Sequence, residues 1–153
     1  TGVKSRSQIY TIADRHNVYF IANKSSRSRS YSSLGLPFVR VNGTIFAFDR
    51  HKGKQLWKQD VPNQNLVLSQ FANSPVLTFA MRTYVRKGPL NYWTLGVVAI
   101  DKKSGRKLLN TTAPFNNSFR SVDVNLADRY VELRSYNDRI RLIAVDRKTA
   151  AAK

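Results

Sequence analysis

The chain has 153 residues, which is enough for one ordinary domain and too few for two. Its 26 Lys and Arg residues outnumber its 9 Asp and Glu residues, giving a formal net charge of +17. The lack of cysteine excludes disulfides, thiolate metal sites and cysteine nucleophiles, and no apolar run approaches the roughly 18 residues of a membrane-spanning helix.

Short β-rich runs separated by turn residues follow one another along the chain, and no segment keeps a helical period for long. The runs lie between breaks rich in Asp, Asn, Gly and Pro. They predict strands at residues 8–12, 18–23, 43–49, 54–60, 66–71, 75–84, 93–100, 106–111, 119–125, 129–135 and 139–146. We therefore expect an all-β fold built as an antiparallel meander.

A hairpin motif is repeated in register. Residues 47–57 read Ala-Phe-Asp-Arg-His-Lys-Gly-Lys-Gln-Leu-Trp, and residues 99–109 read Ala-Ile-Asp-Lys-Lys-Ser-Gly-Arg-Lys-Leu-Leu. Residues 144–150 repeat only the first half. An Asp side chain can bond to the backbone two residues further on, and Gly adopts positive φ without steric cost. The motif therefore predicts tight turns followed by an outer strand, and its structural residues are Asp49, Gly53, Trp57, Asp101, Gly105 and Asp146.

The pattern Ala-x-Asp-x-x-x-Gly-Lys-x-Leu-Trp at residues 47–57 resembles the repeat of quinoprotein-like (PQQ-like) β-propellers. The second copy has Leu109 in place of Trp, and the third has Ala150 in place of Gly. The resemblance implies four-stranded blades, in one propeller-like segment with units at about 8–60, 66–111 and 119–153. About three blades do not close a ring, so we expect a longer polypeptide or another chain to complete it. A generic β-meander with Asp/Gly turns is the alternative.

The resemblance does not carry the catalytic machinery of the family. Quinoprotein dehydrogenases bind pyrroloquinoline quinone with calcium and use acidic metal ligands, a catalytic Asp and an adjacent cysteine pair. This chain has no cysteine, and fold alone does not assign function. We predict no cofactor, no metal site and no catalytic residue. Asp60, Asp123 and Glu132 show neither paired spacing nor a partner, whereas turn segments hold His16, His51, Asp14, Asp49, Asp101, Asp128, Asp138 and Asp146.

Two longer interruptions, at residues 24–42 and 85–92, each join the second and third strands of a unit. Loops of this length in a compact domain are usually functional or disordered, and we expect residues 25–33 to be among the least contacted. In an antiparallel meander both loops emerge at one end, which predicts a single basic face with aromatic neighbours and no acid. Its cations are Lys24, Arg27, Arg29, Arg40, Arg86 and Lys87.

We expect a non-catalytic protein–protein interaction or scaffold module, whose partner is another protein chain or further blades of the same polypeptide. The alternative is a polyanion-binding module for nucleic acid or acidic polysaccharide, because positive charge attracts polyanions and aromatic rings stack on bases or sugars. A weaker alternative is a fragment of a quinone-dependent dehydrogenase. Only the family resemblance suggests a location, which would be periplasmic or at the cell surface.

Overall fold

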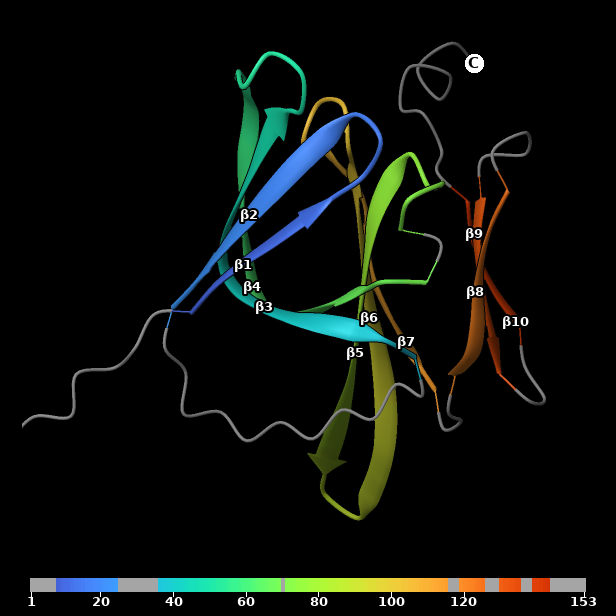
Figure 1. Cartoon of the computed structure of the whole chain (residues 1–153). Coiled ribbons are helices and arrows are strands. Elements are labelled where there is room, and N and C mark those ends of the chain that lie inside the picture. Colours follow the sequence, from blue (N-terminus) through green and yellow to red (C-terminus); the bar gives the residue numbers. More distant parts are fainter. Residues whose placement is uncertain are drawn as a thin grey trace, which may run out of the picture.

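A computed structural model describes residues 8–24, 36–69, 71–115, 119–125, 130–135 and 139–143 (Figure 1). The strands are β1 (Gln8–Ala13), β2 (Asn17–Asn23), β3 (Phe38–Asp49), β4 (Gln55–Val67), β5 (Val76–Lys87), β6 (Leu90–Asp101), β7 (Lys107–Pro114), β8 (Phe119–Asn125), β9 (Tyr130–Ser135) and β10 (Arg139–Ile143). Strands β1 to β7 form one sheet in chain order that does not close into a barrel, and β8 to β10 form a second sheet. Neighbouring strands pair antiparallel, so the predicted all-β antiparallel meander is confirmed. No helix within the described ranges has the length and apolarity needed to cross a membrane.

One long strand joins the first two units, where the sequence predicted two separate strands. The predicted strands 54–60 and 66–71 are replaced by β4, which continues through Pro62 and Asn63. At this point Asn63 has a φ of 46° and the register between β3 and β4 shifts. Asn tolerates this left-handed conformation better than most residues, and a bulge accommodates the missing N–H of proline. The residues that resemble a turn therefore form a bulge, and the sheet continues past it.

The predicted interruption at residues 24–42 also contains strand residues. Strand β3 begins at Phe38, because residues 38–41 pair with residues 64–67 at the far end of β4. Arg40, which we expected in a loop, therefore lies on a strand. Residues 25–35, which include the stretch predicted to have few contacts, lie outside the described residues.

Residues 85–92 form the end of a long hairpin and not the predicted loop. Lys87 pairs with Leu90 across a two-residue turn of Gly88 and Pro89. Gly88 has a φ of 60°, and glycine at the first position of such a turn is typical of type II′, whose twist suits a hairpin. Strands β5 and β6 therefore extend away from the rest of the sheet as a two-stranded ribbon (Figure 1).

The main hydrophobic core lies between the two halves of the bent sheet. Tyr19, Ile45 and Trp57 enter it from the first unit, and Phe79 and Ile100 enter it from the second. Each side chain of this size contributes roughly 1.5–3 kcal/mol when it is fully buried. Apolar packing between faces of β2–β4 and β5–β6 therefore holds the two units together.

A second hydrophobic cluster lies on the opposite face of β5 and β6. Successive strand residues point to opposite sides of a sheet, and both sides of this hairpin are buried near its base. The second cluster consists of Val67, Ala80, Leu95, Val97 and Phe115.

Candidate interaction surfaces

The two complete copies of the motif form turns with the predicted geometry. Gly53 and Gly105 have φ values of 63° and 71°, and each donates its N–H to the carbonyl of the Asp that opens its turn, at 2.9 and 2.8 Å. The Asp49 carboxylate accepts two backbone N–H groups at 2.9 and 2.7 Å, and that of Asp101 accepts one at 3.0 Å. The hydrogen bonds from the N–H groups of Lys52 and His51 lower the pKa of Asp49. The acidic side chains therefore fix the turns.

Trp57, at the end of the first motif, packs on the turn of the second. Its Nε1 donates to the Lys102 carbonyl at 2.8 Å. Its indole lies against Gly105, where an added Cβ would come within 2.6 Å of the ring. Trp57 is 8% exposed, whereas its neighbour Leu56 is 41% exposed. Gly105 is therefore needed for two reasons, its positive φ and the space that the ring occupies.

Lys102, which the sequence analysis did not single out, joins the two units at the same place. Its Nζ is 2.8 Å from Asp14 Oδ2, donates to the Phe71 carbonyl and lies 4.3 Å from the centroid of the Phe71 ring. Its backbone N–H donates to the Pro75 carbonyl at 3.0 Å. The side chains of Lys102 and Asp14 are only 7% and 5% exposed. Each charge therefore depends on the other, because an unpaired charge at this depth is costly.

Asp14 fixes its own turn, as predicted, and also anchors this junction. Its Oδ1 accepts the backbone N–H groups of His16 and Asn17 at 2.9 and 2.8 Å, and its Oδ2 accepts the Tyr19 hydroxyl at 3.2 Å. Burial alone raises the pKa of Asp14, but Lys102 and the two N–H groups outweigh it and keep the pKa below 3.8. Burial raises the pKa of Tyr19 above its usual range, so the phenol remains a donor.

The corresponding turn of the first unit is open. Gly53 has the same left-handed conformation as Gly105, but within the described part of the chain a Cβ on Gly53 would meet nothing within 4 Å. In the aligned motif, Arg50 stands at the position of Lys102. The first turn therefore offers the same backbone shape as the second, and no ring from the described residues rests on it.

An exposed apolar surface lies on the sheet face that leads to this turn, beside the exposed charges of Lys58 and Asp60. Residues paired directly across strands share a face, so Phe20 lies beside Phe46. The rings of Phe20 and Phe48 meet edge to face, with centroids 5.5 Å apart, yet Phe20 is 39% and Ile9 is 71% exposed. We call this surface the outer face, and it consists of Ile9, Val18, Phe20, Phe46, Phe48 and Leu56.

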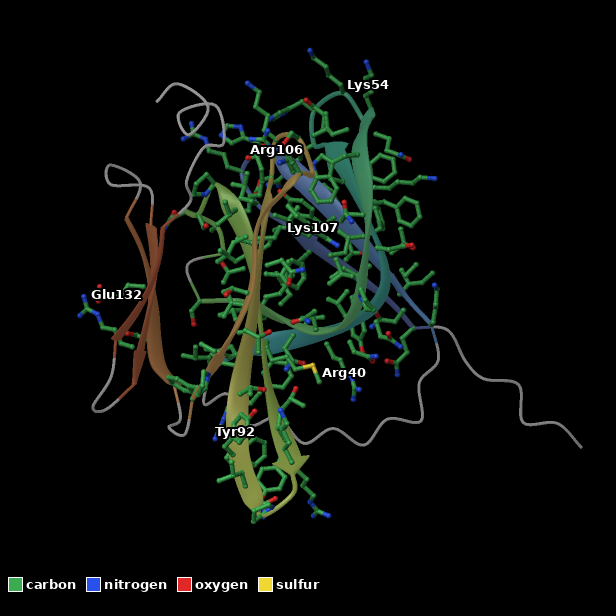
Figure 2. All side chains as sticks on the ribbon, turned by 180° about the vertical axis from the view of Figure 1, so that it is seen from behind. Arg40, Lys54, Tyr92, Arg106, Lys107 and Glu132 are labelled. Atoms are coloured by element: carbon green, nitrogen blue, oxygen red, sulfur yellow. The ribbon has the colours of Figure 1, made fainter. Side chains whose placement is uncertain are left out.

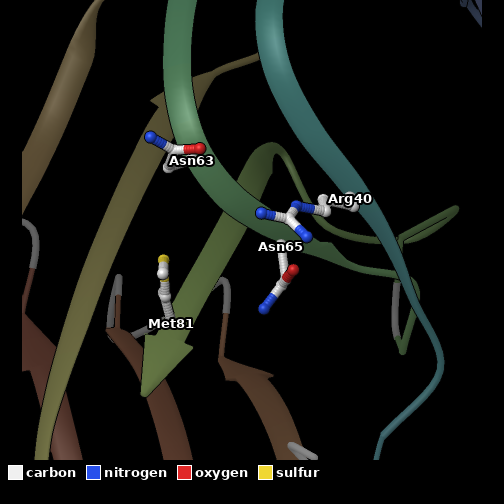
Figure 3. A pocket seen from close by; sticks show the side chains of 4 residues that line it. All are labelled: Arg40, Asn63, Asn65 and Met81. Atoms are coloured by element: carbon white, nitrogen blue, oxygen red, sulfur yellow. The ribbon is translucent and has the colours of Figure 1, made fainter. Parts of the chain in front are cut away.

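Two cations of the predicted basic face lie near the bulge between β3 and β4. Lys24 follows β2 and donates its N–H to the Asn42 carbonyl at 2.8 Å. Arg40 lies on β3 and lines a small pocket with Asn63, Asn65 and Met81 (Figure 3). The pocket adjoins the base of the ribbon, because Met81 belongs to β5.

The other described cations of that face are distant from this pocket. Arg86 and Lys87 lie near the tip of the ribbon, where five strand residues place Arg86 ~17 Å beyond Met81. As consecutive strand residues, they also point to opposite faces of the ribbon. Arg27, Arg29 and the turn residue Asp146 lie outside the described residues. The described cations thus do not gather into one patch.

A row of alternating cations and rings occupies one face of the ribbon, and the sequence analysis did not recognise it. Tyr84 pairs directly with Trp93, and their ring centroids are 5.0 Å apart. The Arg82 guanidinium lies over the Trp93 ring at 4.7 Å, and that of Arg86 lies over the Tyr84 ring at 5.7 Å. We call these four side chains the ladder.

Two acids that the sequence left without a partner have one. Asp60 accepts a hydrogen bond from the Thr44 hydroxyl, and Glu132, which is 1% exposed, pairs with Arg134 two residues along β9. Among the residues that the structure describes, no three His, Asp or Glu side chains gather as they would around a metal ion. Asp128 and Asp138 lie outside those residues.

Comparison of the chain with protein-family models, with curated proteins and with solved structures finds no match in any of the three. The fold itself defines an all-β protein, and its first two units are joined by Trp57 and Lys102.

Proposed function

We propose that the chain is a non-catalytic interaction or scaffold module of the quinoprotein-like propeller type, whose outer face docks another unit of the same kind. That unit belongs to another protein chain or to further blades of the same polypeptide. The observation that carries the proposal is the packing of Trp57 on the Gly105 turn. This contact shows, within the chain itself, how one unit packs on the next.

The turn of the first unit has the same shape as the turn of the second unit on which Trp57 packs. Its Gly53 turn has the matching conformation and open space above it. The Arg50 carbonyl corresponds to the Lys102 carbonyl that accepts the indole N–H of Trp57. A Trp at the aligned position of an incoming unit could therefore pack on the Gly53 turn and donate its indole N–H to the Arg50 carbonyl.

The outer face supplies the apolar contact for such a unit. Phe20 and Ile9 lie on the adjacent strands β2 and β1 and remain 39% and 71% exposed. Exposed apolar faces of this kind mark interaction sites. Among the described strands β1 pairs only with β2, and the backbone groups along its other edge favour association. The propeller interpretation accounts for this exposure, because neighbouring blades pack face to face.

Sedimentation velocity of the full chain over a range of concentrations tests the proposal. We expect the wild type to associate and Phe20→Lys to shift the equilibrium towards monomer, because a charge cannot be buried unpaired in an apolar contact. Leu90→Lys is the matched control, since Leu90 is 65% exposed at the distant tip of the ribbon. A wild-type monomer at all concentrations that also fails to bind a hydrophobic dye would contradict the proposal.

A further inference from the structure

The β5–β6 ribbon is accessible because it extends beyond its neighbouring strands. The pairing of β7 with β6 ends at Thr94, apart from one bond from the Phe115 N–H to the Trp93 carbonyl at 2.9 Å. On the other side, β5 pairs with β4 only at Phe79. From about Tyr84 to its tip, the ribbon therefore has a strand neighbour only across the hairpin among the described strands.

The ladder combines preformed cation sites with rings on this accessible ribbon. The guanidinium groups of Arg82 and Arg86 lie over Trp93 and Tyr84, at 4.7 and 5.7 Å from the ring centroids. These contacts favour the side-chain conformations seen here and reduce the freedom that is lost on binding. Tyr84 is 42% exposed. An arginine fixed beside an exposed ring is suited to a ligand that carries an anion next to a planar group.

The charge around the ladder favours an anionic partner. No acidic residue occurs between Asp60 and Asp101, a stretch that includes Arg82, Arg86 and Lys87. In addition, the Nε atom of Arg82 is buried and has no hydrogen-bond partner among the described residues. The ladder therefore carries positive charge that no acid of its own stretch of sequence compensates.

We propose that the ladder binds single-stranded nucleic acid, with phosphates at Arg82 and Arg86 and an unpaired base on Tyr84. A single strand leaves its bases free to stack on side chains, and such stacking is tolerant of sequence. The opposite end of the molecule is also basic, with Lys54, Arg106 and Lys107 far from Tyr92 at the ribbon tip (Figure 2). Charge alone would attract any polyanion to that opposite end. The stacking of a nucleobase on Tyr84 is what would distinguish binding at the ladder.

Fluorescence anisotropy with a labelled 20-nucleotide oligothymidine, added to the full chain, tests the proposal. An abasic strand of the same length and charge should bind at least ~5-fold more weakly, which is the lower end of the contribution of one stacked base. Tyr84→Leu should lower the affinity for oligothymidine by a similar factor. Tyr92→Leu, on the opposite face of the ribbon, should leave it within ~2-fold.

The arginines have a matched control in the neighbouring residue. Arg86→Gln should weaken binding and lower the salt dependence by about 0.7 in log K against log salt, the value for one phosphate contact in a single strand. Lys87→Gln removes the same charge from the opposite face and should change neither quantity to that extent. Circular dichroism and thermal unfolding must show all variants folded.

Three results would overturn the proposal. The first is equal affinity for oligothymidine and the abasic strand, which would mean binding by charge alone. The second is an equal effect of Arg86→Gln and Lys87→Gln, and the third is tighter binding of a duplex or of an acidic peptide than of the single strand. Because these variants leave the outer face intact, their outcome is independent of unit docking.

Discussion

Adding one methyl group at Gly105 should separate the two roles of the motif glycine. Gly105→Ala places a Cβ 2.6 Å from the Trp57 ring, and Gly53→Ala places one in open space at nearly the same φ. The two substitutions therefore share the backbone strain, and only the first displaces the indole.

The expected loss of stability for each substitution follows from the backbone conformation and from the distance to the Trp57 ring. Left-handed backbone costs an ordinary residue roughly 1 kcal/mol, and this is the whole expected effect of Gly53→Ala. At Gly105 the ring must also retreat by roughly 1 Å to reach ordinary contact. That movement breaks the 2.8 Å bond from Trp57 to the Lys102 carbonyl, which contributes about 1 kcal/mol, and overpacking adds at least about 1 kcal/mol. We expect Gly105→Ala to cost about 3 kcal/mol in total.

Urea unfolding followed by far-UV circular dichroism measures both free energies of unfolding. The difference between the two variants, about 2 kcal/mol, corresponds to roughly 4–8 °C in Tm for a domain of this size. Equal destabilisation within ~0.5 kcal/mol would refute the reasoning, because it would mean that the contact with Trp57 does not explain the glycine.

Four further predictions concern the junction and the bulge in β4, each measured by the same unfolding assay. Lys102→Met should cost about 3 kcal/mol by leaving the buried Asp14 carboxylate unpaired, whereas Lys103→Met, at its exposed neighbour, should stay within ~0.5 kcal/mol. Because the folded pKa of Asp14 lies below 3.8, its ionised form contributes stability that is present above the unfolded pKa and is lost as pH falls through the folded pKa. Asp14→Asn should therefore lose stability at neutral pH and show a shallower loss in acid, and an unchanged pH profile would contradict the pairing. Trp57→Phe keeps a ring but loses the bond to Lys102 and should cost about 1–2 kcal/mol, whereas the same change at Trp93 should have a smaller effect. Asn63→Val should cost about 1–2 kcal/mol at its φ of 46°, whereas Asn63→Gly should be nearly neutral, and equal effects would contradict the bulge.

The sequence predicts the turns well because their geometry is local. Gly53 donates its N–H to the Asp49 carbonyl, and Asp49 donates its own N–H to the Lys54 carbonyl. The second copy repeats both bonds, from Gly105 to Asp101 and from Asp101 to Arg106. The alternation of buried and less buried residues along β3 is equally local. These features do not depend on residues that are distant in the sequence.

The errors occurred where a distant strand decides the local structure. Pro62 and Asn63 have the composition of a turn, but pairing with β3 continues past them and makes them a bulge. Lys102 has the sequence context of a solvated turn lysine, and it is buried because Asp14, 88 residues away, turns towards it. The ladder was overlooked because Arg86, and the pairing of Tyr84 with Trp93, become part of it only when residues 85–92 are interpreted as strand.

The central claim is that the first unit of this chain packs on the second by placing Trp57 on the Gly105 turn. A double-mutant cycle of Trp57→Leu and Gly105→Ala tests it most directly. With the indole removed, Gly105→Ala should cost only the roughly 1 kcal/mol of backbone strain, so the coupling free energy should be about 2 kcal/mol. Effects that add within ~0.5 kcal/mol would contradict the claim, because independent residues cannot form the contact on which the docking proposal depends.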